Sequence, residues 1–234
     1  MCGDCGFRRR MSAGFQTRPR SSRGGGNVRG LWKASQAEGR KAELCRLKGA
    51  CSVGQDVGPP QILPTPLMRQ PVYLRPPESS DEHEFLASVK KSADLHSPWT
   101  SPPSTPENFR AYLEKMSMPE NAAFLVCRRA DDCLVGVFNV TNIVRGAFQS
   151  GYLGYYAFAG HERQGLMRKG LEEVVRCAFQ DLELHRLEAN IQPTNVASIA
   201  LVKACGFLRE GYSPRYLKIN DRWCDHERWA ILAA

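Results

Sequence analysis

The chain has 234 residues and a formal net charge of +8, and residues 1–60 carry all of this excess, with 12 Lys and Arg against 4 Asp and Glu. No run is long and apolar enough for a transmembrane span or a secretory signal, so we expect a cytoplasmic protein with no membrane partner. Residues 1–60 are also rich in Gly and Arg and too poor in aliphatic residues to offset chain entropy by burial. We therefore predict a disordered basic extension over residues 1–60 and one α/β domain over residues 66–234.

The basic extension leaves two interpretations open. Its arginines could neutralise phosphates of a nucleic acid or a ribosome without sequence preference; they include Arg8, Arg9, Arg10, Arg18, Arg20 and Arg23. We favour a functionally idle extension, because no aromatic stacking platform accompanies these charges. Two cysteine pairs could hold zinc, namely Cys2 with Cys5 and Cys45 with Cys51. The gap between the pairs is long and glycine-rich, so we expect no metal, and we expect the remaining cysteines to be reduced.

The domain is expected to alternate strands and helices. In chain order the pattern predicts a strand over 72–75, a helix capped by Ser80 or Asp81, a helix capped by Thr105, strands over 124–128 and 134–142, a strand from Tyr152, a long helix from Met167, a strand through Leu187, Ala189 and Ile191, a short helix capped by Thr194 or Asn195, and strands over 216–219 and 223–232. Hairpins lie at both ends and a strand–helix–strand crossover lies in the middle. This order predicts a mixed, mostly antiparallel sheet with helices on both faces.

The segment from Tyr152 to Leu182 carries the clearest functional pattern. Its residues alternate up to Phe158 as in a strand, and from Met167 they form an apolar stripe at helical spacing. The turn between them contains Gly165, and such a turn aims backbone N–H groups and a helix N-terminus at one point, where phosphate oxygens can bind. On spacing alone the glycine is equally explained as turn chemistry, because many strand–turn–helix units bind nothing.

Further short motifs accompany this turn. They are Asn142-Ile-Val-Arg-Gly-Ala-Phe148, Tyr152-Leu-Gly-Tyr155, Gly165-Leu-Met167, Ala189-Asn190, Pro193, Asn195 and Gly206-Phe207. Together they resemble the RimJ/RimL branch of the GNAT acetyltransferases, which acetylates N-terminal amines of ribosomal proteins, over about residues 66 to 232. Two positions depart from the phosphate-loop pattern of that family: Glu162 replaces Gln or Arg, and Met167 replaces a small residue. We expect Glu162 to point outward into solvent, so that the site survives.

The resemblance implies a GNAT fold and a site for acetyl-CoA as co-substrate. In that family the turn holds the pyrophosphate, and unpaired N–H groups at a bulge in the preceding strand face the pantetheine arm. The implied contacts are Ala157, Phe158, Ala159, Arg163, Gln164, Gly165, Leu166, Met167, Arg168 and Asn195. From spacing alone, Ala157 to Ala159 would be read as ordinary strand packing.

Proton transfer is less clearly encoded. By resemblance a hydroxyl in the region of Ser198 protonates the leaving thiolate, but a hydrogen bond at the start of a helix explains this serine equally well. Asn190 lies on the strand beside the cofactor strand, and Glu188 shares its face and could accept a proton through water. A glutamate in such a strand is more often a solvent-exposed surface carboxylate than a base. If the amine arrives neutral, no strong base is needed.

The acceptor is expected near two further segments, with Trp99 in one and Asn139, Asn142 and Arg145 in the other. Such polar groups can bind a peptide backbone or carboxylates, and they can equally satisfy strand ends and turns. We therefore expect an enzyme that moves the acetyl group of acetyl-CoA to an amine by direct attack in a ternary complex, with the N-terminal α-amine of a ribosomal protein as acceptor. Two alternatives stay open: a small-molecule amine as acceptor, and a non-catalytic acetyl-CoA-binding or ribosome-associated module.

Overall fold

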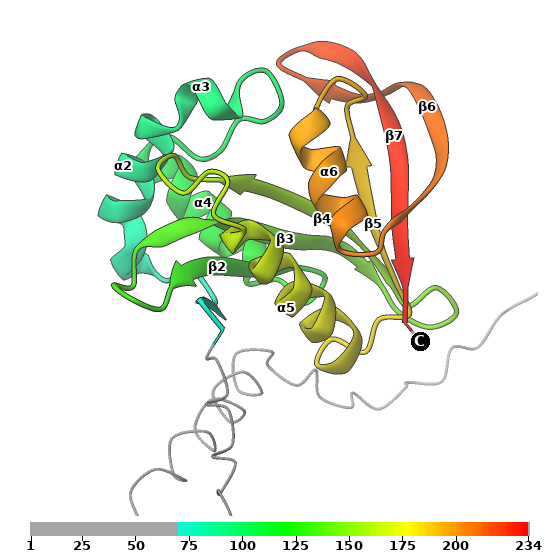
Figure 1. The fold of residues 1–234 in the computed structure, drawn as a ribbon, viewed down its shortest axis with the longest axis horizontal. Helices are drawn as coiled ribbons and strands as arrows, with labels where there is room; N and C mark the ends of the chain where they lie inside the picture. The colour runs from blue at the N-terminus through cyan, green and yellow to red at the C-terminus, as the bar shows by residue number, and fades with distance from the viewer. Residues whose placement is uncertain (1–69, 234) are drawn as a thin grey trace, which may run out of the picture.

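The computed structural model describes residues 70–233, and the expectations for residues 1–60, including the two zinc pairs, lie outside this range. Seven strands form one sheet in the order β1-β2-β3-β4-β5-β7-β6 (Figure 1). The elements are β1 (Val72–Arg75), the 3-10 helix η1 (Ser79–Asp81), α2 (Glu82–Lys91), α3 (Ala93–His96), α4 (Pro106–Met116), β2 (Ala122–Arg128), β3 (Leu134–Val144), β4 (Ser150–Ala157), α5 (Leu166–Gln180), β5 (Arg186–Ile191), α6 (Val196–Ala204), β6 (Leu208–Ile219) and β7 (Arg222–Leu232). The expected mixed, mostly antiparallel sheet is confirmed.

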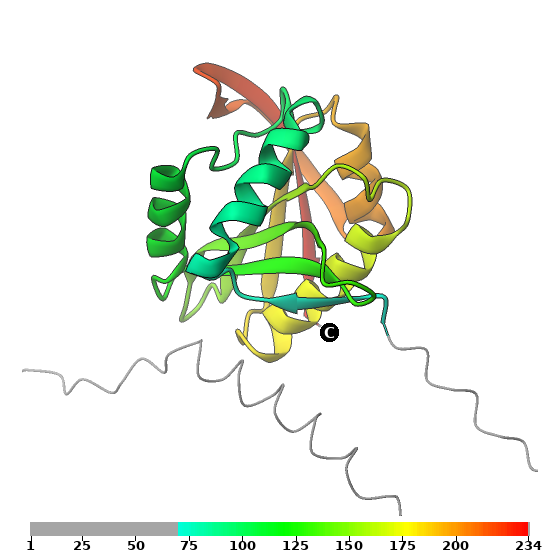
Figure 2. The same ribbon diagram turned by 90° about the vertical axis from the view of Figure 1, so that its left-hand side faces the viewer.

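Helices cover both faces of the sheet, as predicted. On one face, α2 and α4 bury Phe85 and Phe109 against β2, β3 and the end of β4. On the other face, α5 buries Leu171 and Val174 against the opposite sides of the same strands. Figure 2 shows the sheet between these two helical layers. Successive strand residues point to opposite faces, so each residue of β4 and β5 can be assigned to the α5 face or to the α2/α4 face.

Strands β4 and β5 form the parallel pair of the sheet, and they pair over a short length. Ser150 to Tyr152 lie opposite Arg186 to Glu188, although β4 continues to Ala157 and β5 to Ile191. Beyond these pairs the two strands diverge (Figure 1), and we call the region between them the wedge. The backbone groups of the second half of β4 therefore have no strand neighbour on this side.

Two differences from the expected elements have local causes. The helix α3 has four residues, which is too short to produce a helical period in the sequence. Strand β6 begins at Leu208, eight positions before the expected start. The sequence did not reveal its first half, because the pairing with β7 shifts register twice, between Arg209 and Gly211 and between Ser213 and Leu217. Such bulges break the alternation by which a strand is recognised. Within residues 70–233, no helix has the length and apolar character needed to cross a membrane.

Candidate active site

The turn before α5 presents a helix start with unpaired backbone donors. Gly165 is the N-cap in the left-handed conformation (φ 72°), and no side chain caps this helix, whereas Thr105 caps α4 and Asn195 caps α6. The first intrahelical bond runs from the N–H of Lys169 to the carbonyl of Gly165 at 3.1 Å. The N–H groups in the first turn of α5 are therefore available to an external acceptor, and the helix dipole favours an anion there.

The side chains around this turn leave it able to bind a negatively charged ligand. Glu162 is exposed, as expected, but it folds back so that its carboxylate accepts the N–H of Gly160 at 3.0 Å. Its pKa is lowered by its own backbone N–H and by that of Gly160. Lys91 approaches from α2, since its Nζ lies 3.5 Å from where a Cβ on Gly160 would be. A Cβ on Gly165 would meet no heavy atom within 4 Å, so a ligand can approach this backbone closely.

The end of β4 differs in detail from the expected bulge. The N–H of Phe158 donates to the carbonyl of Val135 at 2.7 Å, and the N–H of Ala159 donates to Ser92 Oγ at 2.8 Å. The ring of Phe158 is buried in the core between α2, α4 and the sheet. Phe158 and Ala159 therefore do not present free N–H groups to a cofactor, contrary to the expectation. Because antiparallel pairing alternates, the N–H groups of Tyr155 and Ala157 are the ones that point away from β3 into the wedge.

Helix α6 borders the wedge from the side of β5. Asn195 Oδ1 accepts the backbone N–H of Ser198 at 3.1 Å, which leaves its amide nitrogen free to donate. Tyr155 Oη donates to the carbonyl of Ser198 at 3.1 Å, and this bond ties β4 to the first turn of α6. Asn195 and Ser198 thus lie together, and the Tyr155 side chain holds the first turn of α6 beside β4.

The α2/α4 face of the sheet carries neutral polar groups beside the wedge. Tyr112 Oη donates to Asn139 Oδ1 at 2.9 Å, and Asn139 lies opposite Gly154 on β4. Tyr156 is on the same face of β4, and its buried Oη has no hydrogen-bond partner. Burial raises the pKa of both tyrosines, so their hydroxyls remain protonated and act as donors. Gly154 is exposed, and a Cβ there would meet nothing within 4 Å, so the space above it is open.

Asn190 and Glu188 lie on this same face of β5, because Leu187, Ala189 and Ile191 point toward α5. Asn190 Oδ1 is buried and has no hydrogen-bond partner. Glu188 accepts a bond from Arg186 Nε at 2.8 Å, and Arg186 also pairs with Glu210. The one carboxylate among the expected catalytic residues is therefore already engaged by a cation.

The loop between α3 and α4 closes over this face. The carbonyl of Trp99 accepts a bond from Gln192 Nε2 at 3.5 Å, and Ser101 Oγ donates to Asn220 Oδ1 at 2.7 Å in the β6–β7 turn. These two bonds connect the loop to the residue after β5 and to the last hairpin, which lie far from it in sequence. Trp99 belongs to this loop, and its expected place near the acceptor stays a prediction.

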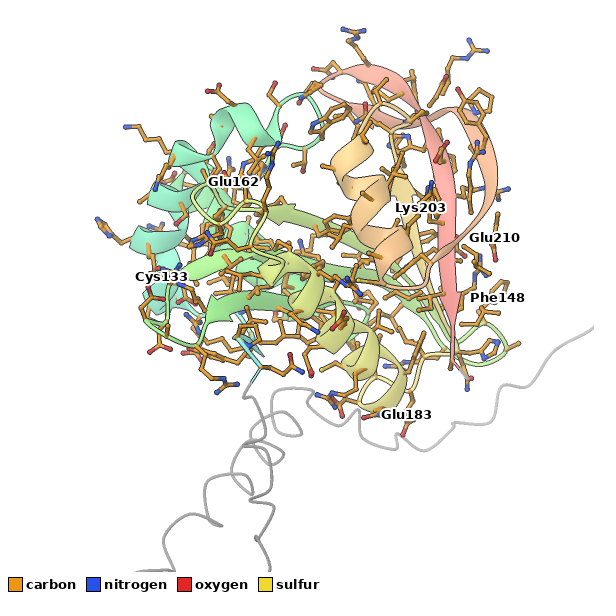
Figure 3. All side chains as sticks on the ribbon, viewed as in Figure 1. Cys133, Phe148, Glu162, Glu183, Lys203 and Glu210 are labelled. Carbon is orange, nitrogen blue, oxygen red and sulfur yellow. The ribbon has the colours of Figure 1, made fainter. Side chains whose placement is uncertain are left out.

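Asn142, near the end of β3, and Arg145, in the loop that follows, lie away from the turn before α5 (the phosphate turn), and their assignment to the acceptor site stays a prediction. Arg145 donates to the carbonyl of Leu182, just past the C-terminus of α5. The 15 residues of α5 separate this point from the phosphate turn by about 22 Å. Figure 3 labels Glu162 in the phosphate turn, and it labels Phe148 and Glu183 at the other end of the molecule. The loop follows β3 and precedes β4, so it must lie where β4 begins.

Several residues near this candidate site gave no signal in the sequence. Lys91, Ser92, His96, Tyr112 and Tyr156 stand in helical or strand patterns that explain them as surface or core residues. Their positions beside the site come from contacts across the fold, and spacing in the chain cannot show such contacts. Among residues 70–233, no group of three or more His, Cys, Asp or Glu side chains could hold a metal ion.

Comparisons with known proteins agree with this geometry. Residues 72–208 match the family described as Acetyltransferase (GNAT) domain. The probable N-acetyltransferase YjcK of Bacillus subtilis (strain 168) is 31% identical over 169 residues, which cover 69% of this chain and 93% of that protein. The ribosomal protein uS5-alanine N-acetyltransferase of Escherichia coli (strain K12) is 39% identical over 98 residues, which cover 42% of this chain and 50% of that protein.

Among solved structures, Mycobacterium smegmatis RimJ in complex with CoA-disulfide superimposes with a TM-score of 0.64 at 25% identity, covering 69% of this chain and 82% of that one. The expected relation to the RimJ/RimL acetyltransferases is confirmed by these similarities. The chain therefore belongs to the GNAT acetyltransferase family, as an acetyl-CoA-dependent N-acetyltransferase of that type.

Proposed function

We propose that the protein acetylates the N-terminal α-amine of a protein, with a ribosomal protein as the natural candidate. The relative from Escherichia coli acts on the alanine of ribosomal protein uS5, as its name states. Transfer would take place by direct attack of the amine on the thioester in a ternary complex. The neutral polar character of the α2/α4 face beside the wedge is the observation that carries this choice of acceptor.

That face suits a peptide better than a polyamine. Its groups with unpaired buried atoms are the Tyr156 hydroxyl, a donor, and Asn190 Oδ1, an acceptor. A peptide backbone supplies both an acceptor and a donor for such groups, and burial without partners would otherwise destabilise the fold. A polyamine is bound most strongly by unpaired carboxylates, and Glu188 is already paired with Arg186. The open space above Gly154 gives room for the first residue of the acceptor.

Acetyl-CoA fits the rest of the site. The unpaired N–H groups at the start of α5 and the positive charge of Arg163, Arg168 and Lys91 would hold the pyrophosphate. The N–H groups of Tyr155 and Ala157 would hold the pantetheine arm and polarise the thioester carbonyl, and the amide nitrogen of Asn195 would donate to the same arm. These assignments keep Gly165 and its neighbours as cofactor contacts. They replace the expected N–H groups of Phe158 and Ala159 with those of Tyr155 and Ala157.

Two residues are assigned to the chemistry itself. Asn190 Oδ1 would accept an N–H of the attacking amine and hold its lone pair toward the thioester carbon. The nitrogen becomes positively charged on attack and would release one proton to solvent. As the carbon–sulfur bond breaks, the Ser198 hydroxyl would give its proton to the sulfur and regain one from solvent. Glu188 holds an ion pair, so we assign it no base role. An α-amine has a pKa of about 8 and is partly neutral near physiological pH, so it can attack without a strong base.

The test uses a panel of short peptides with acetyl-CoA. The peptides share one sequence with an internal lysine and differ at the N-terminus, which is free Ala, free Ser or a blocked amine, and spermidine is included. Thiol release gives the rate, and mass mapping locates the acetyl group. We expect turnover of the free N-termini only. Acetylation confined to lysine or spermidine would overturn the choice of acceptor, and acetyl-CoA binding without thiol release from any amine would indicate a non-catalytic module.

A further inference from the structure

Two buried polar side chains from the α2–α3 corner hold the end of β4. His96 Nε2 lies 2.8 Å from the carbonyl oxygen of Ala157, and Ser92 Oγ accepts the N–H of Ala159 at 2.8 Å. A carbonyl oxygen carries no proton, so the hydrogen of this imidazole is on Nε2. Ser92 is fixed in turn by its own bond to the carbonyl of Ser88 at 2.6 Å. His96 and Ser92 are 4% and 1% exposed, so water does not compete for these bonds.

This contact replaces a missing strand. After Tyr152 and Glu188, β4 has no hydrogen-bonded neighbour on its wedge side, and its pairing with β3 ends at the bond from Phe158 to Val135. The next residues lead directly into the phosphate turn at Gly160. The imidazole is also wedged edge-on against the rings of Tyr156 and Phe158, at 5.3 and 6.4 Å between ring centroids. His96 therefore has a single orientation, and its hydrogen bond fixes the carbonyl of Ala157 in space.

We propose that His96 and Ser92 are positioning residues for acetyl transfer, because they fix the backbone from Ala157 to Ala159 and with it the N–H groups that receive the thioester and the pantetheine arm. The N–H and carbonyl of Ala157 belong to adjacent peptide units and point to the same side of the strand. A shift of the carbonyl therefore moves the N–H that faces the wedge. An error of about 1 Å in such a position can cost about a hundredfold in rate.

The experiment compares three substitutions at position 96 in the full chain. His96→Leu keeps an apolar side chain of similar size and removes the donor. His96→Gln places an amide nitrogen where Nε2 lies, and His96→Asn carries the same amide one bond short. We expect His96→Leu and His96→Asn to weaken acetyl-CoA binding about tenfold or more by calorimetry, and His96→Gln to stay within about twofold of the wild type. Ser92→Ala should act in the same direction as His96→Leu.

Two controls separate positioning from general stability. Adenosine 3′-phosphate 5′-diphosphate carries the three phosphates of CoA without the pantetheine arm, so its affinity should change by no more than about twofold in every variant. Val89→Ala removes buried apolar surface from α2 and keeps the side chains of Ser92 and His96, so it should lower the melting temperature and leave acetyl-CoA affinity unchanged. If the His96→Leu and Ser92→Ala variants bind acetyl-CoA as tightly as the Val89→Ala variant, the inference is wrong. These affinities need no acceptor, so the result is independent of the peptide panel.

Discussion

The sulfur of Met167 lies in the space that a side chain at position 136 would fill. A Cβ built on Gly136 would be 2.6 Å from Met167 Sδ and 2.7 Å from the backbone oxygen of Tyr156. Met167 is the second residue of α5 and Gly136 is on β3, so this pair sets how closely the start of the helix approaches the sheet. The missing side chain on β3 thus accommodates a large residue where the related phosphate loops have a small one.

We predict that Gly136→Ala lowers the free energy of unfolding by about 1–3 kcal/mol through overpacking. Met167→Ala in the same chain should restore part of this loss, because the contact with the sulfur disappears while the contact with the Tyr156 carbonyl remains. Urea denaturation of the two single variants and the double variant gives the coupling, which we expect to be about 0.5–3 kcal/mol for residues in contact. If the changes in the free energy of unfolding of the two single variants summed to that of the double variant, the two residues would not compete for this space.

The part of the site that is local in sequence could be predicted. Gly165 and the apolar stripe of α5 lie within one segment, and Asn195 caps the helix that contains Ser198, so the chain itself specifies their proximity. His96 reaches Ala157 across 61 residues and Ser92 reaches Ala159 across 67. Neither contact leaves a periodic signature, because each depends on how α2 and α3 pack on the sheet.

The distance of Arg145 from the phosphate turn follows from the order of the strands. Strand β3 runs antiparallel to β4, so the loop that leaves β3 must lie at the start of β4. The phosphate turn follows the other end of β4. Connectivity alone therefore separates Arg145 from the phosphate turn, whereas matching motifs to a family gives residue identity without position.

We predict that Gly165→Glu abolishes acetyl-CoA binding in a protein that still folds. The new carboxylate would lie where the helix start attracts an anion, and the left-handed backbone disfavours any side chain there. Gly146→Glu is the matched control, since Gly146 has the same φ of 72° and equally open surroundings but lies in the β3–β4 loop. Calorimetry should find affinity lost at position 165 and kept at 146. If both variants kept the affinity of the wild type for acetyl-CoA, the phosphate turn would not be part of the site.

Stability should fall in mild acid. Burial lowers the pKa of His96 and of His226 below the unfolded value of about 6.5. Between the folded and unfolded pKa the unfolded chain binds more protons, so stability is full above about pH 6.5 and is lost as the pH falls below it. Each histidine contributes at most about 1.4 kcal/mol per pH unit in this window. Urea midpoints from pH 8 to pH 5 measure the slope, and His96→Gln should make it shallower; an unchanged slope would contradict this origin.

The size of the acceptor subsite should depend on Gly154. A leucine there would project into open space on the α2/α4 face, so it should leave folding intact and block the first residue of the acceptor. We expect Gly154→Leu to lower kcat/KM for a free N-terminal peptide by about tenfold or more, with acetyl-CoA affinity within about twofold of the wild type. Gly154→Ala should have a much smaller effect. If both substrates were affected alike, the open space would belong to the cofactor side of the wedge.

Ser198→Ala separates proton donation from helix structure. The backbone N–H of Ser198 remains bonded to Asn195 and its carbonyl to Tyr155, so the substitution removes the hydroxyl without displacing α6. The hydroxyl is needed only as the thiolate leaves, so kcat should fall about 10²-fold while acetyl-CoA affinity changes by no more than about twofold. Tyr155→Phe is the contrasting variant. It keeps the Ser198 hydroxyl but releases α6 from β4, so it should weaken acetyl-CoA binding more than it slows the bound complex. Single-turnover kinetics with a peptide that the wild type acetylates distinguishes the two, and full turnover by Ser198→Ala would leave the serine with only its place in the first turn of the helix.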